Sequence, residues 1–564
     1  MAVSKIDLDK CIGCGTCVDS CPMDVFRLDT VVEYRMEASP CSLACPLGVK
    51  QREYHDLIRT DRLDEAAEAL RLCHPMPAIT GRLCPHPCET ECSRNAVDEA
   101  VNINGLEQYL GDYLLALGPP PTDCCVDGRV ADGHGADRGE VAVIGSGPAG
   151  LAAAYHLTLA GHRVTVFEQG DRLGGVLRSA VPTFRLPEDT LDAQIEFYRT
   201  MGITFRTGVR VGRDMSLEVL RKEGYRAIVA ATGAARSVGL SAPGADARGI
   251  TSALGFLSAV KSGEIRAISG EVAVIGGGSV ALDTARTAVR LGADSVSVVC
   301  LERLEPGLKD SMRALTEEID DSLAEGVVVH PSRGVDSFVV KDGRVSAVKC
   351  VECLSVRDND GRFNPVYGAC VLPREIEAEM VILAIGQTTD PGLVPEGFTT
   401  DERGFIAADV LTKQVVGSLF AVGDAVTGPA TVVEALAAGK RAALSIGRYL
   451  RGEDMHSGLD DRPPRATDPP KESIPVIERV KRRTVPAQER RRSFQDTVLP
   501  LDRQEAQTES GRCLTCGSRS VITYLDDCQV CRLCQHYCPT DAIEVTEGVL
   551  LGSLHGWDVV TLGR

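Results

Sequence analysis

The stretch Glu140-Val-Ala-Val-Ile-Gly-Ser-Gly-Pro-Ala-Gly150 joins a short apolar run to the glycine pattern G-x-G-x-x-G. A helical pattern follows over residues 151–160, and a second β-branched run at 163–167 ends in Glu168. Strand, glycine loop, helix, strand and acidic residue, in that order, form the complete fingerprint of a Rossmann-like α/β domain that binds a dinucleotide. The chain therefore contains at least one such domain.

The residues of this loop have separate roles in binding a pyrophosphate. Gly145 permits the tight turn, Gly147 lets the phosphates approach the backbone, and Gly150 lets the helix pack on the strand. Free N–H groups at the helix N-terminus and the helix dipole favour the anion. Glu168 is expected to accept hydrogen bonds from the adenosine ribose hydroxyls. The neighbouring residues that we expect at this site are Pro148, Ala149 and Gln169.

Further motifs around this fingerprint indicate which dinucleotide binds. Gly174-Gly175 follows Glu168, Ala231-Thr232-Gly233 ends a strand pattern, and residues 419–424 form a second strand pattern that ends in Gly-Asp. This set resembles FAD enzymes of the glutathione-reductase type, in which the Asp binds the flavin ribityl chain. The resemblance implies bound FAD, with contacts from Gly175, Thr232, Gly233, Gly423, Asp424 and Thr431.

A second fingerprint, Val272-Ala-Val-Ile-Gly-Gly-Gly-Ser-Val-Ala281, lies inside the first domain, and its second strand pattern, 295–301, is followed by Glu302-Arg303. This is the usual place of a nicotinamide nucleotide domain inserted between two halves of an FAD domain. An acidic residue at the strand end binds a ribose 2′-hydroxyl and repels a 2′-phosphate. Glu302 therefore favours NADH, although Arg303 leaves NADPH open. The residues expected at this site are Gly276, Gly278, Ser279, Val280, Ala281, Glu302 and Arg303.

Disulfide reductases built on this plan carry a redox cysteine pair beside one of the nucleotide segments. Residues 168–182 and 276–287 contain no cysteine. Cys350 and Cys353 form a C-x2-C, but they lie in a strand pattern, where we expect a surface strand, whereas a redox pair normally opens a helix. We therefore expect the flavin to exchange electrons with metal clusters and not with a disulfide.

Cysteine is the outlier of the composition, with 22 residues among 564. Two runs have the spacing C-x2-C-x2-C-x3-C-P, which is that of bacterial ferredoxins with 4Fe–4S clusters. The ligands predicted by these runs are Cys11, Cys14, Cys17 and Cys21 near the N-terminus and Cys528, Cys531, Cys534 and Cys538 near the C-terminus. In two-cluster ferredoxins the fourth cysteine of a run ligates the other cluster. Either each end forms its own one-cluster module, or the two ends meet in one two-cluster domain.

A third group of cysteines carries a family resemblance. Its motifs are Cys41-Ser-Leu-Ala-Cys45-Pro46, Gly81-Arg-Leu-Cys84-Pro-His-Pro-Cys88-Glu-Thr-Glu-Cys92 and Val101-Asn-Ile-Asn-Gly-Leu-Glu107-Gln108-Tyr109. They resemble the helical two-cluster domain of the glutamate synthase small-subunit family, which also opens dihydropyrimidine dehydrogenase and the large subunit of NADH-dependent ferredoxin:NADP oxidoreductase. The resemblance covers about residues 38–450. Apolar residues at helical spacing, from Leu57 to Leu70, are expected in the domain core.

The resemblance implies eight ligands for two clusters, one of them Glu107 or, as the alternative, Gln108. The first C-x2-C of the family pattern is missing, but Cys513 and Cys516 resemble it, so we expect the C-terminal segment to fold back. One cluster would be held by Cys41, Cys92, Cys513 and Cys516, and the other by Cys45, Cys84, Cys88 and Glu107. A zinc ribbon of Cys513, Cys516, Cys528 and Cys531 competes with this interpretation, but it would break the ferredoxin run. Fifteen cysteines and Glu107 make sixteen ligands, enough for four 4Fe–4S clusters.

Charge and hydropathy exclude other classes of protein. With 61 basic and 79 acidic residues, the net charge of −18 argues against nucleic-acid binding. No apolar run approaches the ~18 residues of a membrane helix, and the first ten residues lack the apolar core of a secretory signal. We therefore expect a cytoplasmic protein without a membrane span. The basic runs 481–483 and 490–492 are expected in a solvated connector.

The expected fold class is α/β, with two Rossmann-like domains, a helical iron–sulfur domain before them and ferredoxin-like α+β segments at both termini. The predicted divisions of the chain are a ferredoxin-like segment 1–32, the helical domain 38–118, a linker 119–139, the first half of the FAD domain 140–265, the NAD domain 266–385, the second half of the FAD domain 386–451, a linker 452–512, and a C-x2-C plus ferredoxin-like segment 513–550.

Together these features predict an electron-transfer subunit. NADH would pass hydride to FAD, and electrons would leave singly through four 4Fe–4S clusters to a partner oxidoreductase or ferredoxin. The reverse direction fits the sequence equally well, and no side-chain acid or base is required. A hetero-oligomeric complex is expected, because a chain of clusters needs an acceptor. The alternatives are the small subunit of glutamate synthase itself and a non-catalytic iron–sulfur scaffold or redox sensor.

Overall fold

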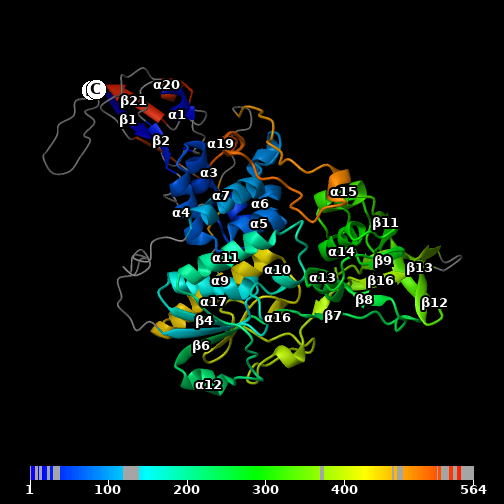
Figure 1. The fold of residues 1–564 in the computed structure, drawn as a ribbon. Coiled ribbons are helices and arrows are strands. Elements are labelled where there is room, and N and C mark those ends of the chain that lie inside the picture. The colour runs from blue at the N-terminus through cyan, green and yellow to red at the C-terminus, as the bar shows by residue number, and fades with distance from the viewer. Residues whose placement is uncertain are drawn as a thin grey trace.

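The computed structural model shows a central body with one nucleotide-binding domain beside it and a small module formed by both chain ends (Figure 1). Within the described residues, no helix is long and apolar enough to cross a membrane. The described residues are 2–6, 11, 16–21, 26–29, 38–118, 139–368, 374–459, 463–466, 474–517, 519–522, 533–537 and 543–547.

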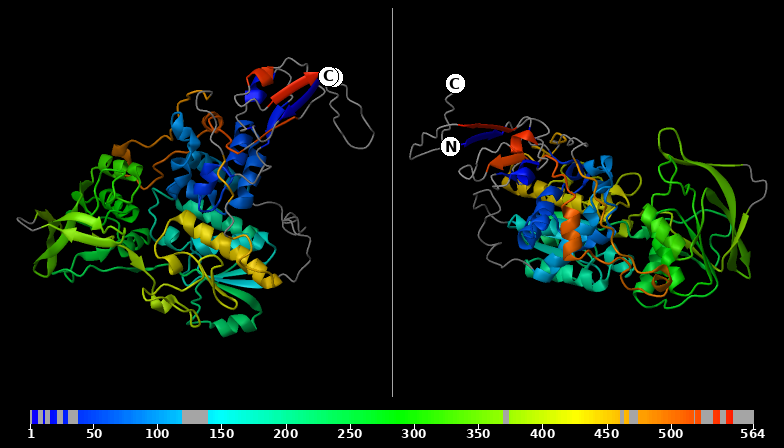
Figure 2. Two further views of the ribbon diagram at one scale, coloured as in Figure 1. Left: turned by 180° about the vertical axis from the view of Figure 1, so that it is seen from behind. Right: turned by 90° about the horizontal axis from the view of Figure 1, so that it is seen from above.

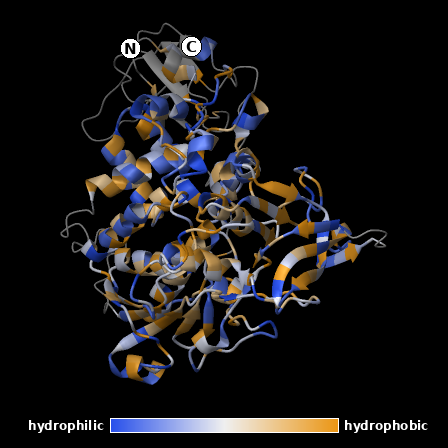
Figure 3. Cartoon of the chain, turned by 45° about the vertical axis from the view of Figure 1, so that its right-hand side comes forward, coloured by the Kyte–Doolittle hydropathy of each residue, from blue (hydrophilic) through white to orange (hydrophobic). Residues whose placement is uncertain are grey.

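The FAD domain is built on a six-stranded sheet in the order β18-β19-β6-β3-β4-β5. Its strands are β3 (Glu140–Ile144), β4 (Arg163–Phe167), β5 (Thr204–Arg206), β6 (Tyr225–Ala230), β18 (Gln414–Val416) and β19 (Leu419–Ala421). Its helices are α9 (Pro148–Leu159), α10 (Val176–Ser179), α11 (Glu188–Thr200), α12 (Leu217–Lys222), α16 (Asp424–Thr427) and α17 (Val432–Arg451). The predicted strand–loop–helix–strand order is confirmed. Hydrophobic residues run along the strands, which places the core between sheet and helices (Figure 3).

The second nucleotide-binding domain has a five-stranded sheet in the order β11-β10-β9-β16-β8. Its elements are β8 (Ile250–Ser252), α13 (Ala253–Lys261), β9 (Glu271–Ile275), α14 (Ser279–Arg290), β10 (Ser295–Val299), α15 (Thr316–Ala324), β11 (Val328–His330) and β16 (Met380–Leu383). The smaller sheet beside it contains β12 (Arg333–Lys341), β13 (Arg344–Arg357), β14 (Phe363–Tyr367) and β15 (Arg374–Glu377).

The start of this domain differs from the boundary predicted at residue 266. Strand β8 pairs in parallel with β16, Ile250 opposite Val381, so the sheet begins about sixteen residues before that boundary. Only the strand that carries the glycine loop has a sequence signature, and an edge strand of three residues does not. The short strands β7 (Arg236–Ser237) and β17 (Gln387–Thr388) pair where the chain crosses between the two domains, and η3 (Pro391–Leu393) follows.

The helical domain consists of α2 (Pro40–Ala44), α3 (Gln51–Arg59), α4 (Leu63–Cys73), α5 (Pro77–Leu83), α6 (Pro87–Thr90), η2 (Ser93–Ala96) and α7 (Ile103–Leu117). The apolar stripe predicted from Leu57 to Leu70 is confirmed as core, divided between α3 and α4. One continuous apolar core joins this domain to the FAD domain. Hydrogen bonds cross the same boundary: the Tyr155 hydroxyl donates to Arg71 O (2.5 Å), and Lys440 Nζ donates to Leu47 O (2.9 Å). The two domains are therefore one structural body.

The two ends of the chain lie side by side (Figure 2). Strand β1 (Ala2–Ile6) pairs antiparallel with β21 (Ile543–Glu547), and β2 (Phe26–Asp29) pairs antiparallel with β20 (Arg519–Ile522). Helices α1 (Thr16–Ser20) and α20 (Leu533–His536) also contact each other. These pairings place the two ferredoxin-type runs in one spatial unit.

Residues 474–517 form an ordered tail that crosses both the helical domain and the second nucleotide-binding domain (Figure 2). The tail contains α18 (Ala487–Arg490) and α19 (Arg503–Ser510). The expectation of a solvated connector is wrong for Arg490 of the second basic run, which is 5% exposed, and Arg512 further along the tail is 0% exposed. Arg490 pairs with Asp321 of α15 at 2.6 Å, and Arg512 pairs with Glu509 at 2.6 Å. Acidic groups of the body and of the tail offset the cost of burying these charges.

We expect Arg512→Ala to lower the free energy of unfolding by about 3–5 kcal/mol, because it leaves the fully buried Glu509 carboxylate without its guanidinium. Arg503→Ala is the matched control on the same tail. Its ion pair with Asp61 is exposed, and such pairs contribute about 1 kcal/mol or less. Chemical denaturation of the two variants measures the difference. Equal losses would contradict the inference that Arg512 holds the tail.

Candidate iron–sulfur, flavin and nicotinamide sites

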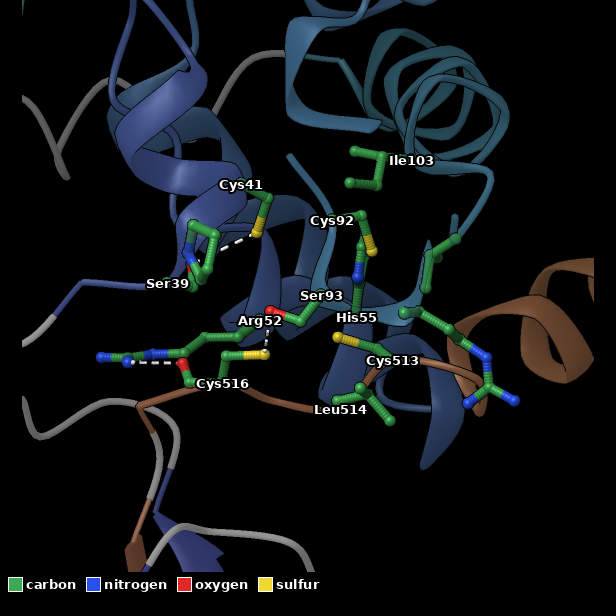
Figure 4. A pocket seen from close by; sticks show the side chains of 13 residues that line it. Ser39, Cys41, Arg52, His55, Cys92, Ser93, Ile103, Cys513, Leu514 and Cys516 are labelled. Carbon is green, nitrogen blue, oxygen red and sulfur yellow. Dashed lines mark hydrogen bonds between the residues drawn. The ribbon is translucent and has the colours of Figure 1, made fainter. Parts of the chain in front are cut away.

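Cys41, Cys92, Cys513 and Cys516 line one cavity between the helical domain and the tail (Figure 4). Cys41 lies in α2, Cys92 directly precedes η2, and the other two follow α19. Their sulfurs surround the cavity. Within the described residues, no group of three or more His, Cys, Asp or Glu side chains is compact enough for a single metal ion. The structure thus brings together the four cysteines that the sequence assigned to one cluster.

The tail reaches this cavity through a turn of defined conformation. Thr515, between the two cysteines, has a φ of 45°, in the left-handed region that reverses the chain direction. Arg52 of α3 holds the second cysteine by donating from Nη1 to Cys516 O at 3.2 Å. The Arg94 guanidinium donates to Arg512 O at 2.8 Å. The position of the C-x2-C is therefore determined by contacts with the helical domain.

The thiols of Cys41, Cys92 and Cys513 have raised pKa values, so without a bound metal they are protonated. Burial, with smaller contributions from the thiols of Cys516 and Cys92, raises the pKa of the Cys41 thiol to about 12. Burial also raises the pKa of Cys513 well above its ordinary value. Binding of iron would replace these protons, because the thiolate is the ligand. The hydroxyls of Ser39 and Ser93 lie 3.2 and 3.5 Å from the Sγ atoms of Cys41 and Cys516.

A second set lies around Glu107 of α7. The carboxylate raises the pKa of the thiols of Cys45, Cys84 and Cys88, in each case after burial as the larger cause, which shows that all four groups are neighbours. Close packing of α5 on α7 produces this arrangement, since a Cβ at Gly111 would lie 2.3 Å from Ala78 N. The set is the one that the family resemblance implied.

Glu107, and not Gln108, faces these cysteines. Glu107 Oε1 accepts a hydrogen bond from Thr80 Oγ1 at 2.5 Å, and His74 Nε2 lies 3.4 Å from the same oxygen. Gln108 Oε1 instead accepts from Arg482 of the tail at 3.2 Å. Partners of this kind orient a carboxylate ligand and set its basicity. Thr80 and His74 carried no sequence signal, because they act through a residue that lies distant in sequence.

The structure describes some of the cysteines in the ferredoxin-type runs. Cys11 and Cys17 are buried, and Cys21 follows α1. Cys534 lies in α20, which contacts α1. Cys14, Cys528, Cys531 and Cys538 lie outside the described residues. The described segments bring the two runs to one place, as the hypothesis of a single two-cluster domain requires.

The glycine loop of the FAD domain has the geometry of a phosphate site. Gly145 has a φ of 106°, and a Cβ there would lie 2.3 Å from Ala231 O, so only glycine fits. At Gly147 no atom lies within 4 Å of the Cβ position, which leaves room for a phosphate on the backbone. Glu168 directly follows β4 beside this loop, where its Oε2 accepts hydrogen bonds from Ser146 N (3.1 Å) and Ser146 Oγ (2.6 Å). Ser146 was not identified from the sequence.

The other predicted flavin contacts converge on the same loop. Gly175 lies against Gly147, and Gly423 lies against Ala149. Burial raises the pKa of Asp424 to about 6, because few hydrogen bonds compensate the carboxylate there. A ribityl hydroxyl would satisfy that carboxylate. The remaining predicted residues lie at or near the ends of strands and helices of the FAD domain: Pro148, Gly150, Gln169, Thr232, Gly233 and Thr431.

The second glycine loop is followed by helix α14, as predicted, and Ser279, Val280 and Ala281 form its first turn. The Glu302 carboxylate lies against this loop, 2.5 Å from where a Cβ of Gly277 would stand. Burial raises the pKa of Glu302. Gly276 and Gly278 flank the same turn, and Arg303 is exposed beside it. This is where an adenosine ribose would meet an acidic side chain.

Cys350 and Cys353 lie in strand β13, as predicted, but the expectation of a surface strand is wrong for them. They are 2% and 5% exposed, and Cys350 packs in an apolar core cluster with residues of β9 and β16. Burial raises the pKa of both thiols, to about 11 for Cys350. Protonated thiols of this kind are poor redox nucleophiles.

Models of known protein families match three segments of the chain. Residues 139–439, more than half of the chain, match the pyridine nucleotide-disulphide oxidoreductases. Residues 34–118 match dihydropyrimidine dehydrogenase domain II with its 4Fe-4S cluster, and residues 4–27 match the 4Fe-4S binding domain. Among solved structures, FprA of Mycobacterium tuberculosis in complex with NADPH aligns with a TM-score of 0.48 and 18% identity, over 56% of this chain and 85% of that chain.

Curated relatives cover most of the chain. The NADP(+)-dependent formate dehydrogenase subunit beta of Moorella thermoacetica is 33% identical over 507 residues, 85% of this chain and 70% of that protein. The glutamate synthase (NADPH) small chain of M. tuberculosis is 35% identical over 436 residues, 73% of this chain and 86% of that protein. The NADPH-Fe(3+) oxidoreductase subunit beta of Geobacter sulfurreducens is 31% identical over 530 residues, 85% of this chain and 75% of that protein. The chain therefore belongs to the pyridine nucleotide-disulphide oxidoreductase family, as an FAD- and iron–sulfur-containing oxidoreductase of the glutamate synthase small-subunit type.

Proposed function

We propose that the chain is the NADH-oxidising subunit of a larger redox enzyme, which passes electrons from NADH through FAD and four 4Fe–4S clusters to a partner oxidoreductase or ferredoxin. The observation that carries this proposal is the cavity shared by Cys41, Cys92, Cys513 and Cys516, because it joins the tail to the helical domain that packs on the FAD domain. The reverse flow, from a reduced partner to NAD, uses the same sites.

When bound, FAD supplies a hydride acceptor that can release electrons singly, and the clusters supply one-electron transfer. The protein binds and orients these groups. Gly147 and the N-terminus of α9 would hold the pyrophosphate, and Asp424 the ribityl chain. Lys440 of α17 donates to Leu47 O in the loop after Cys45, so a flavin-domain helix directly supports the cluster loop. No side chain of the sites described serves as an obligatory acid or base.

The nicotinamide specificity is proposed from Glu302. Its carboxylate lies at the loop, where it would accept bonds from a ribose 2′-hydroxyl and repel a 2′-phosphate. NADPH is the second candidate, since three relatives carry NADP(+) or NADPH in their names. Those names also include the words subunit or small chain, which supports a hetero-oligomeric complex. A glutamate synthase small subunit is the alternative function, and the terminal ferredoxin-type runs argue against it.

Anaerobic titration with NADH tests the function. We expect NADH to bleach the flavin absorbance and then to produce signals of reduced clusters. In Glu302→Arg, the ratio of NADH to NADPH specificity (kcat/KM) should fall at least about tenfold, the effect of ~1.4 kcal/mol, because the new cation attracts a 2′-phosphate.

Glu305→Arg is the control for that change, because it adds the same charge at an exposed residue three positions further along the chain. An unchanged specificity ratio in Glu302→Arg would contradict the nucleotide assignment. Failure of both nucleotides to bleach the flavin would instead favour the scaffold or sensor interpretation.

The cluster assignment is tested by iron content. Cys516→Ala should lose one cluster, about four irons per chain, because it removes one of its four thiolate ligands. Cys73→Ala is a matched control: this thiol is partly buried, like that of Cys516, but belongs to neither ligand set. We expect Cys73→Ala to keep the full iron content. Equal iron loss in both variants would contradict the assignment.

Deletion of residues 518–564 tests whether the two termini form one two-cluster module. The deletion removes β20 and β21, which pair with β2 and β1. We therefore expect a loss of about eight irons, because the N-terminal run would lose both its partner strands and its shared ligands. Loss of only about four irons, with the N-terminal cluster intact, would show two separate modules.

A further inference from the structure

His55 of helix α3 is buried beside the cavity of Cys41, Cys92, Cys513 and Cys516 (Figure 4). The side chain is 1% exposed. Neither of its ring nitrogens has a hydrogen-bond partner among the residues that the structure describes. His55 belongs to neither of the two sets of cluster ligands. Its missing partner must therefore come from what fills the cavity.

The energetics restrict what that partner can be. A buried donor without an acceptor costs about 1–3 kcal/mol, so buried polar groups in folded proteins are nearly always paired. An imidazole carries at least one N–H donor in any protonation state. The occupant of the cavity must therefore offer acceptor atoms. The sulfides and thiolates of a bound iron–sulfur cluster are such acceptors.

The orientation of the ring is determined by the protein itself. The Tyr54 ring meets the His55 ring edge-on, with centroids 4.6 Å apart. Arg52, one turn earlier on the same helix face, donates to Cys516 O. Helix α3 thus presents a preorganised polar face to the cavity, which reduces the entropic cost of any bond made there.

We propose that His55 donates a ring N–H to the cluster held by Cys41, Cys92, Cys513 and Cys516 and so raises its reduction potential. The inference rests on the proposed function, because it requires a cluster in this cavity. Reduction adds one negative charge, so a donor stabilises the reduced form more than the oxidised form. The serine hydroxyls reach the thiolates of Cys41 and Cys516, and His55 is the aromatic donor of the same cavity.

The direct test is pulsed EPR of the reduced holoprotein in which histidine is labelled with ¹⁵N. We expect a weak ¹⁵N hyperfine coupling to one cluster, which is absent from unlabelled protein and from labelled His55→Gln. Labelled wild-type protein that shows no histidine coupling at any cluster would overturn the proposal. Because this result is obtained with the wild-type protein, it can contradict the proposal even if the variants do not fold.

Redox titrations of variants supply the second measurement. His55→Met, which has a similar length and no N–H, should lower the potential of one cluster by about 59 mV, a tenfold change in its reduction equilibrium. His55→Gln keeps an N–H donor and should restore most of that shift. His156→Phe is the control, because His156 is also buried with Nε2 unpaired among the described residues but does not line the cavity. It should leave all cluster potentials unchanged.

Equal potentials in His55→Met and wild type, or equal shifts in His55→Met and His55→Gln, would overturn the proposal. Iron content and flavin bleaching by NADH are measured on the same samples. A wild-type protein that lacks the iron, or whose flavin NADH does not bleach, contradicts the proposed function. A protein with the expected irons and flavin chemistry but without a role for His55 contradicts only the present inference.

Discussion

The buried guanidinium of Arg512 is the interaction on which the rest of the iron–sulfur architecture depends. It is bonded to Glu509 and Asp98, and to the carbonyls of Glu99 and Ala100. A charge this deeply buried is tolerated only when all of its donors have partners. These bonds fix the position of Cys513, which follows directly. Cys513 and Cys516 are the C-terminal half of a cysteine set whose other half lies more than 400 residues earlier.

The second constraint is the shared core of the helical and FAD domains. Because one apolar core spans both, the helical domain cannot move freely relative to the flavin loop. Tyr155 and Lys440 add hydrogen bonds across this boundary from two different helices. The second nucleotide-binding domain is joined to the body by the short β7–β17 pair, by the ion pairs of Arg185 with Asp283 and Glu318, and by the tail, through Arg490 and Phe494. The tail therefore connects the second nucleotide-binding domain to the helical domain. Few local sequence features predict this connection.

Much of the site was predictable because its chemistry demands fixed spacing. A pyrophosphate loop needs glycines at defined positions, and a 4Fe–4S cluster needs cysteines close in sequence. That Cys41 and Cys513 belong to one cluster site was predictable only from the family resemblance, because the first C-x2-C of the family pattern is missing here and Cys513 and Cys516 resemble it. His55, His74, Thr80 and Ser146 were not predictable, because a side chain that supports a site from a neighbouring helix, or from a variable loop position, has no spacing rule.

By itself, the sequence determined the two glycine loops, the strand and helix periodicities around them, and the cysteine runs, since these depend on residues within a few positions of one another. Only the tertiary structure decided that the chain ends pair as β1 with β21, that Glu107 and not Gln108 faces the cysteines, and that β8 belongs to the second sheet. The physical reason is the same in each case. Long-range pairing, helix rotation and edge-strand choice are determined by packing between distant segments, and local sequence does not encode that packing.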